Sequence, residues 1–172
     1  GFISGTITAL AFYNNFVTNL PDKPTKIWLG TTNQADLSAG WIPSTQLTLV
    51  FDGYITYPAG ENTITIHLQT PYMHTPGNLV MMVQRPLDAQ YYSSSDNFLA
   101  QTIGTNRARM VKSIMTDFDP ANPPFTGTVS GQFPKTTIFY SDQELINDLG
   151  CLNISGNPMP TVGNNYIYII NI

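Results

Sequence analysis

The sequence predicts an all-β protein, an antiparallel β-sandwich of jelly-roll type with a C-terminal β-strand extension. Apolar and polar residues alternate with a period of two, and no apolar stripe of helical period stands out. Only 10% of the 172 residues are charged, and Thr, Asn, Ser and Gln hold the polar positions instead. That composition suits strands and turns. Turn residues divide the chain into about ten short strands, as expected for a sandwich.

The amino-terminal half contains the most regular strands. Period-two segments bounded by turn residues predict strands at 3–13, 25–29, 47–57 and 62–68. In the first, Ile7, Ala9 and Ala11 are expected on one face and Leu10 and Phe12 on the other. In the last, inward Ile64, Ile66 and Leu68 alternate with outward Thr63, Thr65 and His67.

The second half is less regular. Residues 78–84 are apolar on both faces, which predicts a central strand covered on two sides. Residues 98–103 and 107–115 predict a hairpin joined at 104–106. The segment 116–127 contains three prolines and is expected to be a loop, and 135–140 is expected to be the closing strand.

A shift in composition then divides the chain. We place the main domain at 1–141 and a linker with a strand-turn-strand extension at 142–172. The extension has predicted strands at 148–154 and from Tyr166 to the last residue, separated by turn residues at 156–160 and 163–165.

Charge and composition exclude several classes of protein. The formal net charge is -4 with seven Lys and Arg residues, so no basic patch is expected to bind nucleic acid. No apolar run is long enough for a transmembrane helix, so we expect no membrane insertion. The single cysteine, Cys151, cannot form an internal disulfide. Low charge with abundant Thr and Asn is typical of secreted adhesive proteins, which predicts an extracellular, cell-surface location.

Five segments occur in an order that resembles a known module. They are residues 5–13 (GTITALAFY), 26–30 (KIWLG), 40–43 (GWIP), 92–98 (YSSSDNF) and 117–124 (DFDPANPP). Together they resemble a β-sandwich module repeated in large secreted surface proteins of Bacteroidetes and related bacteria. The resemblance covers about residues 5–140 and implies an extracellular jelly-roll-like sandwich with no single defined activity.

The extension resembles something different. Residues 148–149, 154–158 and 160–163, followed by the strand at Tyr166, are similar to the first two strands of an adhesion-type immunoglobulin-like domain of bacterial surface proteins. Modules of the first kind also have a strand before residue 5. The chain is therefore expected to lack one strand at its start and to carry surplus strands at its end. A strand-donating subunit would have this arrangement, and so would a trimmed fragment.

The last strand is the strongest functional candidate. Its apolar residues would form an assembly strand that adds to the sheet of a neighbouring copy: Tyr166, Ile167, Tyr168, Ile169, Ile170 and Ile172. The acceptor would be a groove beside residues 3–12, lined by Ile3, Ile7, Ala9, Leu10 and Phe12. Repeated head to tail, this contact builds a homopolymer. The alternative is that the strand pairs within its own chain, with residues 149–154.

Two further sites follow from side-chain chemistry. Tyr91 and Tyr92 are candidates for stacking on a glycan, unless they cap the edge of the sandwich instead. Asp117, Asp119 and Asn122 offer oxygen ligands for calcium, although Asx turns that stabilise a proline-rich loop also explain them. No other cofactor is expected.

Catalysis finds little support in the sequence. His67 falls on a predicted outer face and His74 in a predicted loop, and the only glutamates are Glu61 and Glu144. No motif brings these groups together in a way that acid-base or nucleophilic chemistry requires. We therefore expect a non-enzymatic structural or adhesive protein, with a carbohydrate-binding module as the alternative.

Overall fold

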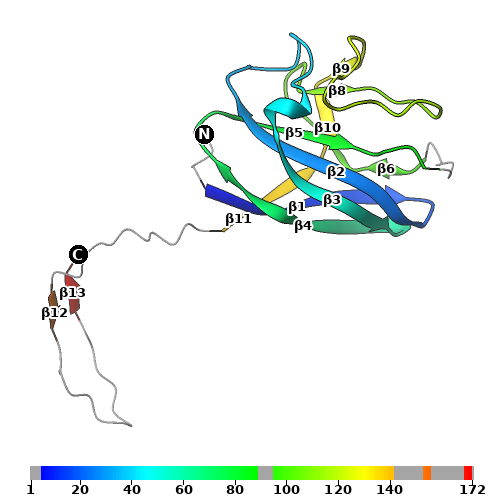
Figure 1. The fold of residues 1–172 in the computed structure, drawn as a ribbon. Helices are drawn as coiled ribbons and strands as arrows, with labels where there is room; N and C mark the ends of the chain where they lie inside the picture. Colours follow the sequence, from blue (N-terminus) through cyan, green and yellow to red (C-terminus); the bar gives the residue numbers. More distant parts are fainter. Residues whose placement is uncertain (1–4, 89–94, 142–152, 156–168, 172) are drawn as a thin grey trace. The chain divides into compact units, whose positions relative to one another are not determined.

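The structure is a computed structural model that describes residues 5–88, 95–141, 153–155 and 169–171. It confirms an antiparallel all-β sandwich (Figure 1). The chain divides into two compact units, Gly1–Ser141 and Asp142–Ile172, and the sandwich lies in the first.

The first four strands are long, and the strands that follow them are shorter. Those described in the first unit are β1 (Gly5–Phe16), β2 (Leu20–Thr32), the 3-10 turn η1 (Ser44–Gln46), β3 (Thr48–Tyr57), β4 (Gly60–His74), β5 (Asn78–Gln84), β6 (Asn97–Phe98), β7 (Ala100–Thr102), β8 (Ala108–Met110), β9 (Thr128–Ser130), β10 (Gln132–Pro134) and β11 (Thr136–Ser141). Those described in the second are β12 (Asn153–Ser155) and β13 (Ile169–Asn171).

Two sheets form the layers of the sandwich. One has the order β11-β1-β4, with β6 also paired to β1, and the other has the order β3-β2-β5. Because β1 pairs with β4 while β2 pairs with β3, the four strands form one ribbon that rolls from the first sheet into the second. This nested pairing is the connectivity of a jelly roll.

The ribbon turns at two adjacent corners, residues 17–19 and 58–59. Asn14 is fully buried at the end of β1, and its Nδ2 donates to the Pro58 carbonyl oxygen at 2.9 Å. Asp96 Oδ1 accepts from the backbone N–H groups of Val17 and Thr18 at 2.8 and 2.9 Å. Backbone groups at a corner have no ladder partner, so these side chains supply their hydrogen bonds.

The core lies between the two sheets. Its buried residues come from β1, β2, β3 and β4, and the largest fully buried ones are Ile7, Leu10, Ile27, Leu29 and Val50. The alternation predicted for 62–68 is confirmed: Ile66 and Leu68 are buried and Ile64 packs against the core, whereas Thr63, Thr65 and His67 are exposed.

The faces predicted for β1 need a correction. Ile7 shares the core with Leu10 and Phe12 instead of lying on the opposite face from them. The pairing register shifts between Ile7 and Ala9 against both neighbouring strands. A bulge of this kind adds one residue and reverses the alternation of side chains beyond it.

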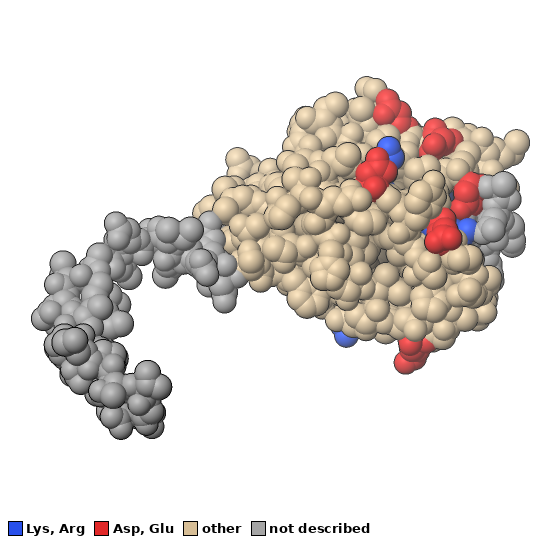
Figure 2. All heavy atoms as spheres, turned by 60° about the horizontal axis from the view of Figure 1, so that its bottom comes forward, with Lys and Arg blue, Asp and Glu red and all other residues tan. Residues whose placement is uncertain are grey.

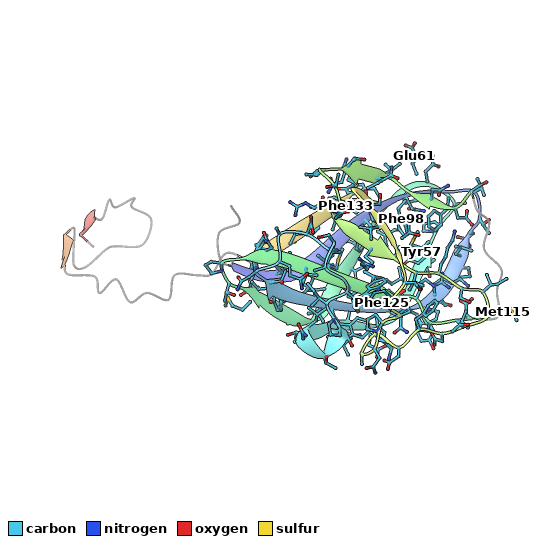
Figure 3. All side chains as sticks on the ribbon, turned by 90° about the horizontal axis from the view of Figure 1, so that it is seen from above. Tyr57, Glu61, Phe98, Met115, Phe125 and Phe133 are labelled. Atoms are coloured by element: carbon cyan, nitrogen blue, oxygen red, sulfur yellow. The ribbon has the colours of Figure 1, made fainter. Side chains whose placement is uncertain are left out.

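Aromatic rings close one end of the core. Phe98 on β6 lies 5.2 Å from Phe16, 5.7 Å from Tyr57 and 6.1 Å from Phe12, measured between ring centroids (Figure 3). All three contacts have the edge-to-face geometry that aromatic pairs favour. The Phe98 ring therefore anchors the short β6 to this end of the core.

Two predictions about strand partners are wrong. β5 is an edge strand, because β2 is its only partner in the described chain, and Val83 is 47% exposed. The predicted hairpin at 98–115 is also absent there, since β7 pairs with β10 and β8 pairs with β9. These pairs again nest into a ribbon, in which Ile103 N donates to the Gly131 carbonyl oxygen at 3.1 Å.

Candidate functional sites

The predicted assembly strand lies in the second unit, and the structure describes only part of it. Ile169 and Ile170 belong to β13, whose residues pair antiparallel with β12 as Asn153 with Asn171, Ile154 with Ile170 and Ser155 with Ile169. Tyr166, Ile167, Tyr168 and Ile172 lie outside the described residues. The described part thus shows the pairing within the chain that the sequence left open as the alternative.

The predicted acceptor groove has no open edge along β1. Ile7, Ala9, Leu10 and Phe12 are all buried, and Ile3 lies outside the described residues. β4 pairs with one edge of β1 from Gly5 to Phe16, while β11 and β6 share the other edge. A donated strand could join β1 only by displacing one of these partners, so the expected position of the acceptor is corrected.

The Gln69 side chain, which no sequence pattern singles out, bridges the edges of β3 and β4. Gln69 on β4 bonds the backbone of Asp52 on β3, although the two strands belong to different sheets. This contact joins the adjoining edges of β3 and β4. At the end of β5, the Gln84 side chain instead donates to the Phe118 carbonyl oxygen at 2.7 Å, in the loop before β9.

The predicted calcium ligands lie in an exposed loop before β9. Asp119 Oδ1 accepts from Ala121 N at 2.9 Å, and Oδ2 accepts from Asn122 Nδ2 at 2.7 Å. These bonds, that of the Asn122 side chain foremost, lower the pKa of the Asp119 carboxyl. Asp117 Oδ1 accepts from Gln84 Nε2 at 3.3 Å instead.

This arrangement is an Asx turn that the chain closes by itself. Within the described ranges, no three His, Cys, Asp or Glu side chains are grouped so that they could hold a metal ion. Calcium at Asp117, Asp119 and Asn122 stays a prediction from the sequence.

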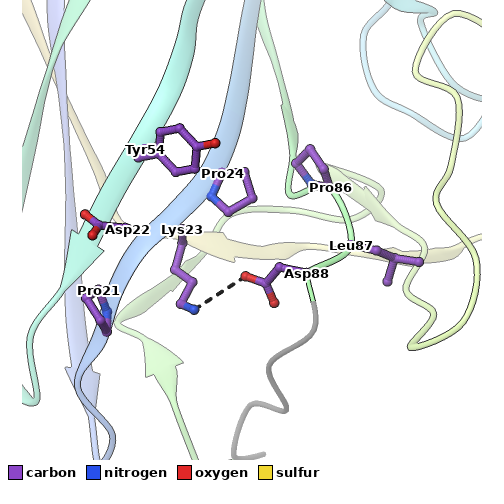
Figure 4. A pocket seen from close by; sticks show the side chains of 8 residues that line it. All are labelled: Pro21, Asp22, Lys23, Pro24, Tyr54, Pro86, Leu87 and Asp88. Carbon is purple, nitrogen blue, oxygen red and sulfur yellow. Dashed lines mark hydrogen bonds and ion pairs between the residues drawn. The ribbon is translucent and has the colours of Figure 1, made fainter.

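A cleft of about 600 Å³ lies where β2 and β3 meet the segment after β5 (Figure 4). Lys23 is buried at its base and its Nζ lies 3.4 Å from Asp88 Oδ2, which Arg85 also contacts at 3.2 Å. Tyr54 is 72% exposed at the rim. The predicted glycan contacts Tyr91 and Tyr92 follow in the chain but lie outside the described residues.

A groove of about 530 Å³ lies beside Trp41. Pro43, Pro123 and Phe125 line its apolar walls. Phe125 is fully exposed (Figure 3). The Arg109 guanidinium carbon lies 6.0 Å from the Trp41 ring centroid. The groove therefore combines two aromatic rings with a cation, a combination that the sequence did not reveal because its residues come from three distant segments.

Hydrogen bonds hold the walls of this groove in place. Arg109 Nη2 donates to the Leu37 carbonyl oxygen at 3.0 Å, and Ser44 N donates to the Pro120 carbonyl oxygen at 2.8 Å. The second bond joins the two loops that carry Trp41 and Phe125. Such cross-links reduce the ordering that a ligand would have to impose.

The two histidines lie in different environments. His67 is exposed on β4. His74 is fully buried at the end of the same strand, not in a loop, and its Nδ1 lies 3.5 Å from Thr31 Oγ1. Thr31 Oγ1 also lies 3.1 Å from the Tyr72 hydroxyl, so His74 belongs to a polar cluster inside the sandwich.

The surface of the sandwich carries few charges. Figure 2 shows a face on which acidic and basic groups are scattered and most of the area is uncharged. In the described part of the chain, no helix has the length and apolarity that crossing a membrane would need.

Comparison with known proteins adds no relative. No family model matches the chain, and neither a curated protein nor a solved structure matches it.

Proposed function

We propose that this chain is a non-enzymatic, extracellular structural module that joins copies of itself through its C-terminal strand. Residues 166–172 of one copy would add to a β-sheet of the next. The observation that supports this most is that β12 and β13 form a sheet of two strands in the described part of the second unit. Its described ladder has three residue pairs, between β12 and β13.

A two-stranded hairpin without a further partner is marginal in water. β13 is paired along one edge in the described structure, and its sequence context, YIYIINI, is uncharged and strongly β-forming. An added sheet would supply hydrogen bonds to the other edge and would cover apolar side chains. The strand thus gains from a partner even while it remains paired with β12.

The contact would be heterologous, because the donor and the acceptor are different surfaces. A heterologous contact that does not close into a ring builds an open filament. The low charge of the chain supports this proposal, since few like charges would oppose the packing of identical subunits.

Light scattering after size exclusion, over a range of concentrations, tests the proposal. The full chain is expected to form species far larger than its monomer mass of 19.0 kDa, and deletion of 166–172 is expected to leave a monomer. Replacement of Tyr54 by Ala, which removes an exposed ring from the sandwich, serves as the control and should not change assembly. A full chain that stays monomeric throughout would contradict the proposal.

Carbohydrate binding is a second candidate, supported by the groove at Trp41. Sugar-binding sites need an aromatic surface for the apolar face of the ring and polar groups for its hydroxyls. Trp41 and Phe125 supply the first. Arg109 supplies donors, because its Nη1 makes no hydrogen bond within the described structure.

A glycan array followed by calorimetry tests this candidate. Trp41→Ala and Phe125→Ala should each abolish a binding signal, whereas Tyr54→Ala should leave it unchanged. Loss of binding in Tyr91→Ala and Tyr92→Ala, with Trp41→Ala unaffected, would move the site to the loop predicted from the sequence.

A further inference from the structure

We infer that the groove beside Trp41 binds a sugar that carries a carboxylate, such as a hexuronate unit of an acidic polysaccharide. This inference rests on the second candidate function proposed above, carbohydrate binding, and names the chemical class of sugar that the groove would take. It is independent of the assembly of copies of the chain through the C-terminal strand.

The charge of the groove is the first argument. Nine residues line it, and Arg109 is the only charged residue among them. None of the nine carries a carboxylate or a side-chain amide, and the hydroxyl of Ser38 donates to Asp36 Oδ1 at 2.6 Å. The hydroxyl groups of a neutral sugar need acceptors, which Asp, Glu, Asn and Gln side chains supply. The groove lacks these side chains, so its chemistry suits an anionic ligand better than a neutral one.

The Arg109 guanidinium keeps donors that a ligand can use. Its Nε and Nη2 donate to the Leu37 carbonyl oxygen at 3.3 and 3.0 Å, and Nη2 also lies 3.4 Å from the Ser38 carbonyl oxygen. No ion pair within the described ranges includes Arg109. A carboxylate on the ligand would therefore meet an uncompensated cation and receive charge-assisted hydrogen bonds from Nη1.

The carboxyl groups of the surrounding loops are engaged by those loops. Asp36 Oδ1 accepts from the Ser38 backbone and hydroxyl, and Asn106 Nδ2 lies 3.4 Å from Asp36 Oδ2. Asp119 accepts from Ala121 and Asn122 in the same way. Neither aspartate lines the groove, so neither supplies Arg109 with a partner there.

The Trp41 ring gives the groove a surface on which a sugar ring can stack. The Arg109 guanidinium carbon lies 6.0 Å from the ring centroid, so one small ligand can contact both groups. A hexuronate has the matching arrangement, because its carboxylate is attached directly to a pyranose ring with apolar C–H groups. Gly127 packs close to the Trp41 ring, since a Cβ there would lie 3.1 Å from Cζ2. This contact holds the ring in place before a ligand binds.

An acidic peptide is the other class of ligand that carries carboxylates. Extended peptides bind by pairing with free backbone N–H and C=O groups. Pro43 and Pro123 in the walls have no backbone N–H, and the Leu37 and Ser38 carbonyl oxygens already accept from Arg109. The groove thus offers a peptide few backbone partners, which favours the sugar.

Matched pairs of ligands test the inference on the full chain without any substitution. Oligosaccharides of galacturonate, glucuronate and mannuronate are each measured by calorimetry as the free acid and as the uncharged methyl ester. At least one acid is expected to bind about tenfold or more tightly than its ester, because only the acid can pair with Arg109. The affinity of that acid should fall as the salt concentration rises, whereas that of the ester should not.

Two arginine variants locate the charge that is responsible. Arg109→Gln removes the cation and should weaken binding of the acid by about tenfold or more while leaving the ester unaffected. Arg107→Gln removes the same charge at an exposed position outside the groove lining, so it should leave both affinities unchanged. Circular dichroism checks that each variant is folded. Equal losses in the two variants would mean that general surface charge attracts the acid, and the inference would be wrong.

The outcomes separate this inference from the candidate function on which it rests. If an acid and its ester bind equally, or if only neutral sugars bind, carbohydrate binding stands and the assignment of a carboxylate is wrong. If a poly-glutamate peptide binds and none of the sugars does, the groove recognises an acidic peptide and both are wrong. If no sugar and no peptide binds, both are also wrong.

Discussion

Gln69 and Asp52 are joined by two hydrogen bonds although they lie on strands of different sheets. The Asp52 N–H donates to Gln69 Oε1 at 2.9 Å, and Gln69 Nε2 donates to the Asp52 carbonyl oxygen at 3.0 Å. The side-chain amide therefore satisfies the same pair of groups that a residue of an antiparallel neighbour would. One residue thus bridges the edges of β3 and β4.

Loss of this bridge should destabilise the sandwich. Gln69→Ala removes both hydrogen bonds, and because water can reach the exposed site, the expected loss in free energy of unfolding is about 1 kcal/mol. Urea unfolding measures it. Gln132→Ala is the control, since Gln132 is also exposed on a strand but has no side-chain hydrogen bond in the described structure, and it should change stability by less than about 0.5 kcal/mol. Equal effects of the two variants would refute the bridging role.

The corner of the ribbon should depend on Asn14. Asn14→Ala removes the buried hydrogen bond to the Pro58 carbonyl oxygen, and thermal and urea unfolding should show a loss of about 1–3 kcal/mol. Asn15→Ala changes the exposed neighbour on the same strand and should have little effect. A neutral Asn14→Ala would mean that Asn62, which also donates to Pro58, holds the corner alone.

Replacement of two glycines by alanine should lower the free energy of unfolding for two different physical reasons. A Cβ on Gly131 would overlap the backbone carbonyl oxygen of Gly104. Gly131→Ala must therefore push apart the connection between β9 and β10 and that between β7 and β8, at a cost of about 2–3 kcal/mol. Gly60 has open space around it but a φ of +84°, so Gly60→Ala should cost only about 1 kcal/mol of backbone strain. Urea unfolding of both variants measures the two losses in free energy of unfolding. A smaller loss for Gly131→Ala than for Gly60→Ala would contradict the close approach of Gly131 to Gly104.

The Asx turn at Asp119 should be visible in its titration. The Asn122 amide is the main cause that lowers the pKa of the Asp119 carboxyl, so Asn122→Ala should raise that pKa toward its ordinary value of 3.8. Carbon-detected NMR titration measures the change. Asp36, whose pKa is lowered by hydrogen bonds from Ser38, is an internal control that should not respond.

The sign of the associated pH effect follows from the direction of this shift. A carboxyl with a lowered pKa in the folded state binds protons less readily there than in the unfolded chain. Its contribution to stability is present above the unfolded pKa and is lost as the pH falls through the folded pKa. The wild type should therefore lose more stability than Asn122→Ala on acidification below pH 4, and an identical acid dependence would contradict the hydrogen bond.

Local pattern was sufficient to predict the class of fold and some of its strands. The alternation of Ile64, Ile66 and Leu68 with Thr63, Thr65 and His67 predicts both the strand and its buried face, because neighbouring side chains of a strand point to opposite faces. The predicted strand is too short, however, because its alternation was followed only to Leu68. β4 continues to His74 because Gly5 and its neighbours on β1 pair with Tyr72–His74, a partner that the residues near His74 do not indicate.

What the sequence by itself determined is therefore the all-β class and the inward face of β4, which depend on the period of side chains along one strand. It also predicted the jelly-roll type of sandwich, from the turn residues that divide the chain into short strands. Only the tertiary structure decided that β5 lies at an edge, that β1 has no open groove, and that Trp41, Arg109 and Phe125 meet. Edge or centre depends on which distant strand takes the last hydrogen-bonding groups, and an apolar strand such as 78–84 has the same local pattern in either place.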